Sequence, residues 1–140
     1  MTTARDCVPQ AGVLAVRGGR VCLITSRNGK RWVIPKGCQE AGKTAGEMAL
    51  QEAWEEAGLA GALEREPIGA YTYEKAGTTC RVTVFLMHVT EMAEEWPEMS
   101  FRQRRWLSPG RAMATIEDPG LRKLLGKVFA EEGVVLVGQD

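Results

Sequence analysis

An expected helix carries three carboxylates on one side in the segment Glu52-Ala53-Trp54-Glu55-Glu56-Ala57-Gly58-Leu59. At about 100° per residue, the three glutamates fall within an arc of roughly 100°. An apolar stripe on nearly the opposite side would contain Leu50, Ala53, Trp54 and Ala57. Like charges this close repel one another unless a cation lies among them, and such oxygen ligands suit Mg²⁺ or Mn²⁺. A solvated acidic face is the alternative, and the residues before the helix favour the metal site.

A strand and a glycine loop precede this helix. The segment Trp32-Val33-Ile34-Pro35 is typical of a short strand ended by its proline, and Gly37 permits a tight turn with an exposed carbonyl. Thr44 is the expected N-cap, and Glu47 completes a capping box with it. Gly58 is the expected C-cap. The unit is therefore a strand, a glycine loop, a carboxylate helix and a glycine stop.

This unit resembles the box of the Nudix hydrolase family, G-x5-E-x7-R-E-U-x-E-E-x-G-U, in which U is aliphatic. Gly37 opens the box, and the later positions in register are Glu52, Ala53, Glu55, Glu56, Gly58 and Leu59. The resemblance implies a single-domain α/β fold, a Nudix-type α/β/α sandwich with a mixed β-sheet. It also implies metal-dependent hydrolysis of phosphoanhydride bonds, with Mg²⁺ or Mn²⁺ held by the Gly37 carbonyl and by Glu52, Glu55 and Glu56.

Two box positions depart from the family pattern. Lys43 stands where the family has its first Glu, and Gln51 stands where it has Arg. Gln51 can donate a hydrogen bond but lacks the charge and rigid fork of Arg. Lys43 reverses a charge beside a cation site, which predicts weaker metal binding unless its ammonium meets a substrate phosphate. A catalytically weakened Nudix domain, acting as a nucleotide-binding, polyphosphate-binding or regulatory module, is the alternative function.

Segments outside the box resemble one subfamily, the diphosphoinositol polyphosphate and diadenosine polyphosphate phosphohydrolases. They are residues 26–37, Glu40-Ala41-Gly42, Tyr71-Thr72-Tyr73 and residues 89–106. The implied substrate is a polyphosphorylated small molecule, whose several negative charges require cations besides the metal. We expect phosphate contacts from Arg27, Arg31, Lys36, Arg102 and Arg105, although each one singly could be a solvated surface charge.

The general base stays open in the sequence. By family likeness, Glu52 or Glu56 is the favoured residue. A carboxylate from another loop is the alternative, and the candidates are Glu91, Glu94, Glu95 and Glu98. Trp96 could stack on a nucleobase, with packing as the alternative role for it and for Trp106.

The remaining chain predicts further strands and helices in one domain. Strands are expected at residues 10–17, 21–25, 67–73, 81–89 and 105–107. A short helix is expected from Pro109, and an amphipathic helix over residues 121–131. We assign residues 1–8 to a flexible N-terminus, residues 9–133 to the Nudix hydrolase domain and residues 134–140 to a C-terminal tail.

Composition agrees with a globular protein that acts on a small molecule. The 140 residues are 44% hydrophobic and 26% charged, and their formal net charge is zero, so no basic field argues for a nucleic-acid partner. The four cysteines form no C-x-x-C pair, which indicates a reducing, cytoplasmic setting. No signal peptide is apparent, and no apolar run approaches about 18 residues, so no membrane partner is expected. We expect a monomer or a homodimer.

Overall fold

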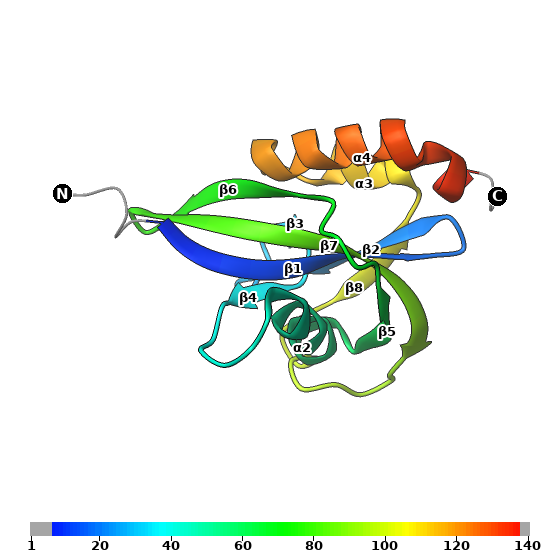
Figure 1. Cartoon of the computed structure of the whole chain (residues 1–140). Coiled ribbons are helices and arrows are strands. Elements are labelled where there is room, and N and C mark those ends of the chain that lie inside the picture. Colours follow the sequence, from blue (N-terminus) through cyan, green and yellow to red (C-terminus); the bar gives the residue numbers. More distant parts are fainter. Residues whose placement is uncertain (1–6, 138–140) are drawn as a thin grey trace.

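The computed structural model describes residues 7–137 and has a mixed β-sheet between helices, which confirms the predicted fold class (Figure 1). The strands are β1 Cys7–Arg17, β2 Arg20–Thr25, β3 Trp32–Val33, β4 Lys36–Cys38, β5 Leu59–Leu63, β6 Gly69–Lys75, β7 Thr78–Met92 and β8 Arg104–Leu107. The helices are α2 Ala45–Ala57, α3 Pro109–Thr115 and α4 Pro119–Val137.

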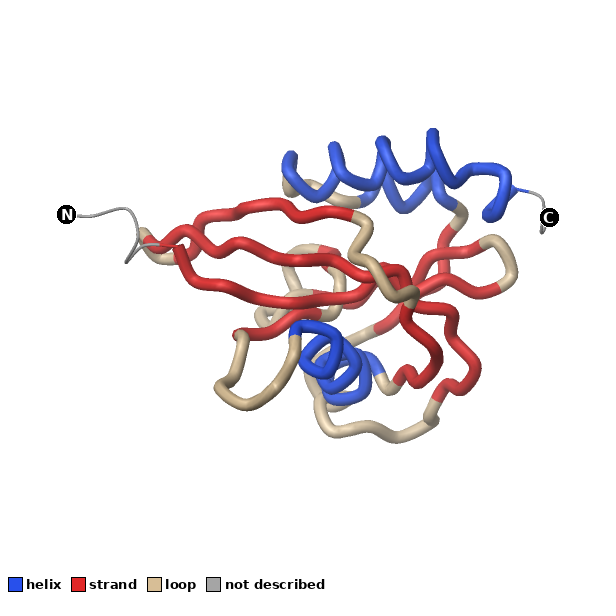
Figure 2. Tube along the Cα trace, in the orientation of Figure 1, coloured by secondary structure: helices blue, strands red, loops and turns tan. Residues whose placement is uncertain are grey.

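The sheet is mixed because β1 and β7 run parallel, in register from Cys7↔Thr79 to Val16↔His88. The neighbouring pairs are antiparallel, and the sheet order is β3-β2-β1-β7-β5, with β4 on β1, β6 on β7 and β8 on β2. Helix α2 covers one face, and α3 with α4 covers the other (Figures 1 and 2). The central strands are therefore buried on both sides.

Strand β1 shows this two-sided burial through its alternation. Leu14 and Val16 belong to the hydrophobic cluster under α3 and α4. Val13 and Ala15 belong to the second cluster, which α2 covers. Successive side chains of a strand point to opposite faces, so a nearly continuous apolar run supplies both cores.

Helix α2 has the caps that the sequence predicts. The Thr44 hydroxyl accepts a hydrogen bond from the backbone N–H of Glu47 at 3.1 Å, and the Glu47 carboxylate accepts one from the backbone N–H of Thr44 at 2.8 Å. Gly58 ends the helix at φ 65°, a left-handed conformation that favours glycine. The helix is thus delimited by local interactions.

The predicted apolar stripe of this helix is correct at Ala53 and Ala57, which are buried, and wrong at its two large residues. Leu50 and Trp54 are 38% and 43% exposed. The buried residues of α2 are Met48, Ala49, Ala53, Glu56 and Ala57. Three alanines let the helix approach the sheet closely, which leaves the large side chains at the rim and turns one glutamate inward.

Several element boundaries differ from the predictions. Helix α4 continues past residue 131 to Val137, and β7 begins and ends three residues outside the predicted 81–89. Strands β4 and β5 were not predicted, because glycine and alanine give a weak strand signal. The expected flexible N-terminus lies outside the described residues for positions 1–6, and Cys7 and Val8 belong to β1. Of the expected C-terminal tail, residues 138–140 lie outside the described residues. Within the described part, no helix is both long and apolar enough to cross a bilayer.

We predict that Gly12→Ala destabilises the protein by about 1 to 3 kcal/mol. A Cβ at Gly12 would stand 2.5 Å from the carbonyl oxygen of Pro35 and 2.8 Å from Cβ of Lys36, where backbone leaves no room. Denaturant unfolding measures the loss. Gly110→Ala is the matched control, because a Cβ at Gly110 meets nothing within 4 Å. Equal stability of the two variants would contradict this prediction.

Candidate active site

Strand β4 and helix α2 meet at Gly37 and Glu52, two residues of the predicted metal site. A Cβ added at Gly37 would stand 2.3 Å from the carboxyl carbon of Glu52 and within 2.7 Å of both its oxygens. Only glycine therefore permits this carboxylate to lie against the β4 backbone. The contact joins the first residue of the box to its central glutamate.

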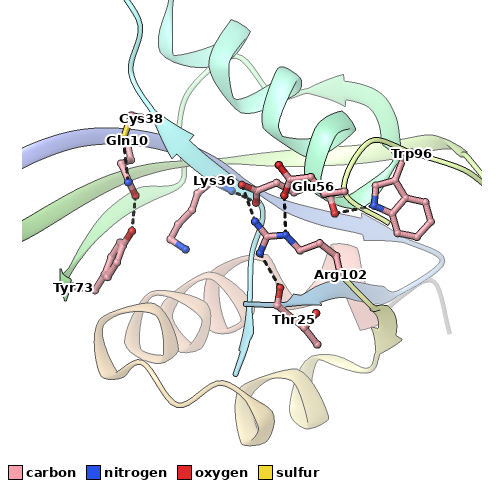
Figure 3. Close-up of polar contacts among 9 residues, drawn as sticks. Gln10, Thr25, Lys36, Cys38, Glu56, Tyr73, Trp96 and Arg102 are labelled. Atoms are coloured by element: carbon pink, nitrogen blue, oxygen red, sulfur yellow. Dashed lines mark hydrogen bonds and ion pairs between the residues drawn. The ribbon is translucent and has the colours of Figure 1, made fainter. Parts of the chain in front are cut away.

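The Glu56 carboxylate lies in a buried network beside this contact (Figure 3). Glu56 is 8% exposed, and its Oε1 accepts a hydrogen bond from the backbone N–H of Lys36 at 3.1 Å. Its Oε2 lies 3.3 Å from Nη2 of Arg102. The same guanidinium donates from Nε to Glu98 at 2.9 Å and from Nη1 to the Thr25 carbonyl at 2.9 Å. All three nitrogens of Arg102 are therefore engaged within the protein.

Burial sets the protonation of this group of charges. It raises the pKa of Glu52 to about 8, and the neighbouring charges of Glu56 and Glu55 act in the same direction. Burial also raises the pKa of Glu56, opposed chiefly by Arg102. The pKa of the Lys36 ammonium is lowered by burial, with Glu56 opposing that shift. The site therefore favours additional positive charge next to its carboxylates.

The donor set fits a hard divalent cation in its chemistry. Carboxylate oxygens and a backbone carbonyl are the ligands that Mg²⁺ and Mn²⁺ prefer. Across residues 7–137, no group of three or more histidine, cysteine or acidic side chains is gathered closely enough to hold an ion. The two oxygens of Glu56 instead face the Lys36 backbone and Arg102. The adjacent carboxylates of Glu52 and Glu56, whose pKa values are both raised by burial, are the groups that a cation would stabilise.

Three of the other four expected phosphate-binding cations lie over aromatic rings. The Lys36 ammonium is 5.0 Å from the centre of the Tyr73 ring. The guanidinium carbons of Arg27 and Arg105 lie 4.9 Å and 4.8 Å from the rings of Phe101 and Trp32. Arg31 is exposed and lies within electrostatic range of Lys36. Within residues 7–137, no carboxylate or carbonyl engages the charged groups of these four residues, whereas all three nitrogens of Arg102 are engaged.

A cavity of about 430 Å³ adjoins Arg102. Its lining includes Thr25, Trp32, Phe101 and Arg102, so it lies between the turn after β2 and the segment before β8. The buried network around Glu56 shares Thr25 and Arg102 with this cavity. The cavity therefore lies next to the carboxylate network.

The two departing box residues contact each other. The Lys43 ammonium donates a hydrogen bond to the side-chain oxygen of Gln51, and it lies 3.6 Å from a carboxylate oxygen of Glu40. An acidic and a basic residue occupy these positions in the family pattern, so the donor and the acceptor have exchanged places. The donor at Lys43 therefore meets an acceptor at Gln51, and the Lys43 ammonium has protein partners.

The segment between β7 and β8 contributes contacts that the sequence did not predict for its candidate residues. Of the four loop carboxylates considered as bases, Glu98 reaches the Glu56 network through Arg102, while Glu91, Glu94 and Glu95 are exposed. The indole N–H of Trp96 donates a hydrogen bond to the Glu56 carbonyl at 3.0 Å, which is a structural role within the protein. The sequence signal for these contacts is the presence of aromatic and basic residues at positions 96–105. This signal does not distinguish structural roles from binding roles.

The chain belongs to the Nudix family, because the NUDIX domain model matches residues 8–128. Members of this family generally use divalent metal cations.

Curated relatives support the assignment. The chain is 36% identical over 118 residues to Nudix hydrolase 12, mitochondrial, of Arabidopsis thaliana, covering 79% of this chain and 58% of that protein. It is 31% identical over 104 residues to diphosphoinositol polyphosphate phosphohydrolase 3-alpha of Homo sapiens, covering 72% and 62%. The chain spans 58%, 63% and 52% of three Arabidopsis relatives, Nudix hydrolases 12, 13 and 4.

Solved structures share the fold. The crystal structure of a C. elegans Ap4A hydrolase superposes with a TM-score of 0.72 at 20% identity, covering 89% of this chain and 97% of that chain. A Nudix hydrolase from Nitrosomonas europaea superposes with a TM-score of 0.75 at 17% identity, covering 89% of both chains.

We predict that the metal-free protein loses stability as the pH rises from about 5 to about 8. The pKa of Glu52 is raised from 4.5 to about 8 in the folded protein. In this window the folded state keeps a proton that the unfolded chain has released, so rising pH favours unfolding. Thermal unfolding in a chelator measures the decline, and Glu52→Gln should remove much of it. An unchanged slope in that variant would assign the decline to another group.

We also predict that Lys43→Glu and Gln51→Arg are coupled. Lys43→Glu alone places a carboxylate beside Glu40, and Gln51→Arg alone places two cations together, so each single change should lower activity. The double variant restores opposite charges and should be at least as active as the wild type, with a coupling energy of about 1 kcal/mol. Steady-state rates of the four proteins give this energy. Lower activity in the double variant than in both single variants would instead place Lys43 at the substrate.

Proposed function

We propose that the chain hydrolyses phosphoanhydride bonds in a polyphosphorylated small molecule with the help of Mg²⁺ or Mn²⁺. The proposal rests chiefly on two adjacent carboxylates, half-buried Glu52 and buried Glu56, which are held against the β4 backbone beside Lys36. The substrate class is that of the diadenosine polyphosphates or the inositol pyrophosphates. Its support is the similarity to a human diphosphoinositol polyphosphate phosphohydrolase together with the cations around the site.

Glu52, Glu55, Glu56 and the Gly37 carbonyl are the groups we propose as metal ligands. A bound divalent cation lowers the pKa of a water molecule and neutralises charge on the leaving phosphate. Glu52 or Glu56 receives the proton of the attacking water, and the raised pKa of Glu52 suits that role near neutral pH. Glu98 remains the candidate from outside the box, since it lies in the same network.

The basic residues divide into two roles in this proposal. Lys36, Arg31, Arg27 and Arg105 bind phosphate oxygens, because their charged groups are not consumed by carboxylates or carbonyls in the contacts described above. Arg102 instead orients Glu56, because all of its nitrogens already have protein partners. The binding residue that we expected at position 102 therefore becomes a positioning residue.

A binding or regulatory module with weakened catalysis is the second candidate function. Its support is the departure of Lys43 and Gln51 from the family box. The contact between these two side chains favours the hydrolase, because the pair is preserved in altered form. For the setting, we keep a cytoplasmic monomer or homodimer without a nucleic-acid or membrane partner. Free Cys22, Cys38 and Cys80 support the reducing compartment, although several plant relatives are named mitochondrial.

A substrate panel with Mg²⁺ or Mn²⁺ tests the proposed activity. The panel contains diadenosine polyphosphates, inositol pyrophosphates, nucleoside triphosphates and nucleotide sugars. The hydrolase predicts release of phosphate or nucleotide from at least one of the first two classes. Measurable binding without turnover of any compound at high protein concentration would favour the binding module instead.

We predict that Glu56→Gln lowers kcat by about 100-fold or more while the fold is kept. The amide is nearly the same size but cannot carry the negative charge that Arg102 and a metal require. Circular dichroism checks the fold, and the substrate panel gives the rate. Glu47→Gln is a control on the same helix, because Glu47 belongs to the N-terminal capping box. Rates like those of the wild type in Glu56→Gln would remove Glu56 from the site.

A further inference from the structure

The C-terminal end of α2 receives its hydrogen-bond donors from a distant part of the chain. The last carbonyls of any α-helix lack partners within the helix. Here the segment 93–104, which comprises the connection after β7 and the first residue of β8, supplies them. The backbone N–H of Glu98 donates to the Glu55 carbonyl at 3.0 Å, and the indole N–H of Trp96 donates to the Glu56 carbonyl at 3.0 Å (Figure 3). The helix that carries the carboxylates is thus anchored at its end.

The guanidinium of Arg104 completes this anchor. Its Nη1 donates to the Ala57 carbonyl at 2.7 Å and lies 3.4 Å from the Gly58 carbonyl. Its Nη2 donates to the Ala93 carbonyl at 2.5 Å. The guanidinium carbon lies 4.1 Å from the centre of the Trp96 ring, so the charge also stacks on the indole. A positive charge is therefore held at the negative end of the helix dipole.

This charge replaces one that the helix itself lacks. The last turn of α2 contains no basic residue. At the same place, a Cβ on Gly58 would stand 2.9 Å from Nη1 of Arg104 and 2.9 Å from Cβ of Trp96. Gly58 therefore serves both the left-handed cap and the close approach of this pair. Tight packing of this kind transmits a displacement instead of absorbing it.

We propose that Arg104, stacked on Trp96, is a positioning residue that fixes the Glu56 carboxylate in the metal site. The inference rests on the proposed function. The segment 93–104 holds Glu56 twice, at its backbone through Trp96 and at its side chain through Arg102, which is itself held by Glu98. Loss of Arg104 would loosen the last turn of α2 and move Glu56 relative to Glu52. Both terminal nitrogens of Arg104 are occupied by carbonyl oxygens, so phosphate binding is not its role.

The test compares Mn²⁺ affinity and kinetics in a small set of variants. Arg104→Met keeps a long unbranched side chain but removes the charge and the hydrogen-bond donors. Arg104→Lys keeps the charge without the guanidinium fork. Trp96→Phe keeps an aromatic ring but removes the indole N–H. Arg111→Met is the matched control, because Arg111 is an exposed residue of α3. Mn²⁺ dissociation constants are measured without substrate, and thermal unfolding is followed in parallel.

Arg104→Met should raise the Mn²⁺ dissociation constant about 10-fold or more and lower kcat by a similar factor, with little change in KM. Trp96→Phe should have the same effect in weaker form, Arg104→Lys should recover part of the loss, and Arg111→Met should match the wild type. If Arg104→Met does not fold, the Lys and Phe variants carry the comparison.

Three results would overturn the inference. Unchanged Mn²⁺ affinity with a lowered melting temperature would make Arg104 a purely structural residue. A raised KM with unchanged Mn²⁺ affinity would make it a phosphate ligand. A wild-type protein that binds no Mn²⁺ would remove the site itself. Failure of the proposed hydrolysis is distinguishable, because the Mn²⁺ affinities can differ as expected even when no compound of the substrate panel is turned over.

Discussion

The pairing of the buried Glu56 carboxylate with Arg102 is the interaction on which the rest of the site depends. A carboxylate that is 8% exposed is costly to bury unless it is paired and hydrogen-bonded, and here one oxygen meets a guanidinium and the other a backbone N–H. Arg102 is buried as well, and its remaining donors reach Thr25 and Glu98. One ion pair thus joins α2, β2, β4 and the segment before β8.

The pair also explains why the site needs more positive charge than the protein supplies. Arg102 and the Lys36 backbone stabilise Glu56, but Glu52 lies against Gly37 and shares the same small volume with a like charge. Burial, followed by the neighbouring charge of Glu56, raises the pKa of Glu52. Groups held in such unfavourable protonation states are typical of functional sites. In the proposed function, a divalent cation neutralises these carboxylates, and the basic side chains stacked on aromatic rings nearby bind phosphate.

Lys43 and Gln51 suggest one conclusion as separate substitutions and another as a contacting pair. As separate changes they remove a negative charge and a guanidinium, which suggests a damaged box. In the structure they form one hydrogen-bonded pair on the outer side of α2, with Glu40 beside the ammonium. The pair still links the glycine loop to the helix, but the hydrogen-bond donor now comes from the loop and the acceptor from the helix. This reversal changes the charge near the site without breaking the local structure.

The sequence by itself determined the elements whose causes are local. The capping box at Thr44, the glycine stop at Gly58 and the amphipathic character of α4 all depend on residues close together in the chain, and the structure confirms them. Only the tertiary structure decided which face of α2 is buried, that Arg102 holds Glu56, and that Arg104 and Trp96 cap the same helix. These contacts join residues about forty or more positions apart. The sequence does not distinguish an exposed arginine from a buried one. The difference arises only when the folded chain places carbonyls and carboxylates around the guanidinium.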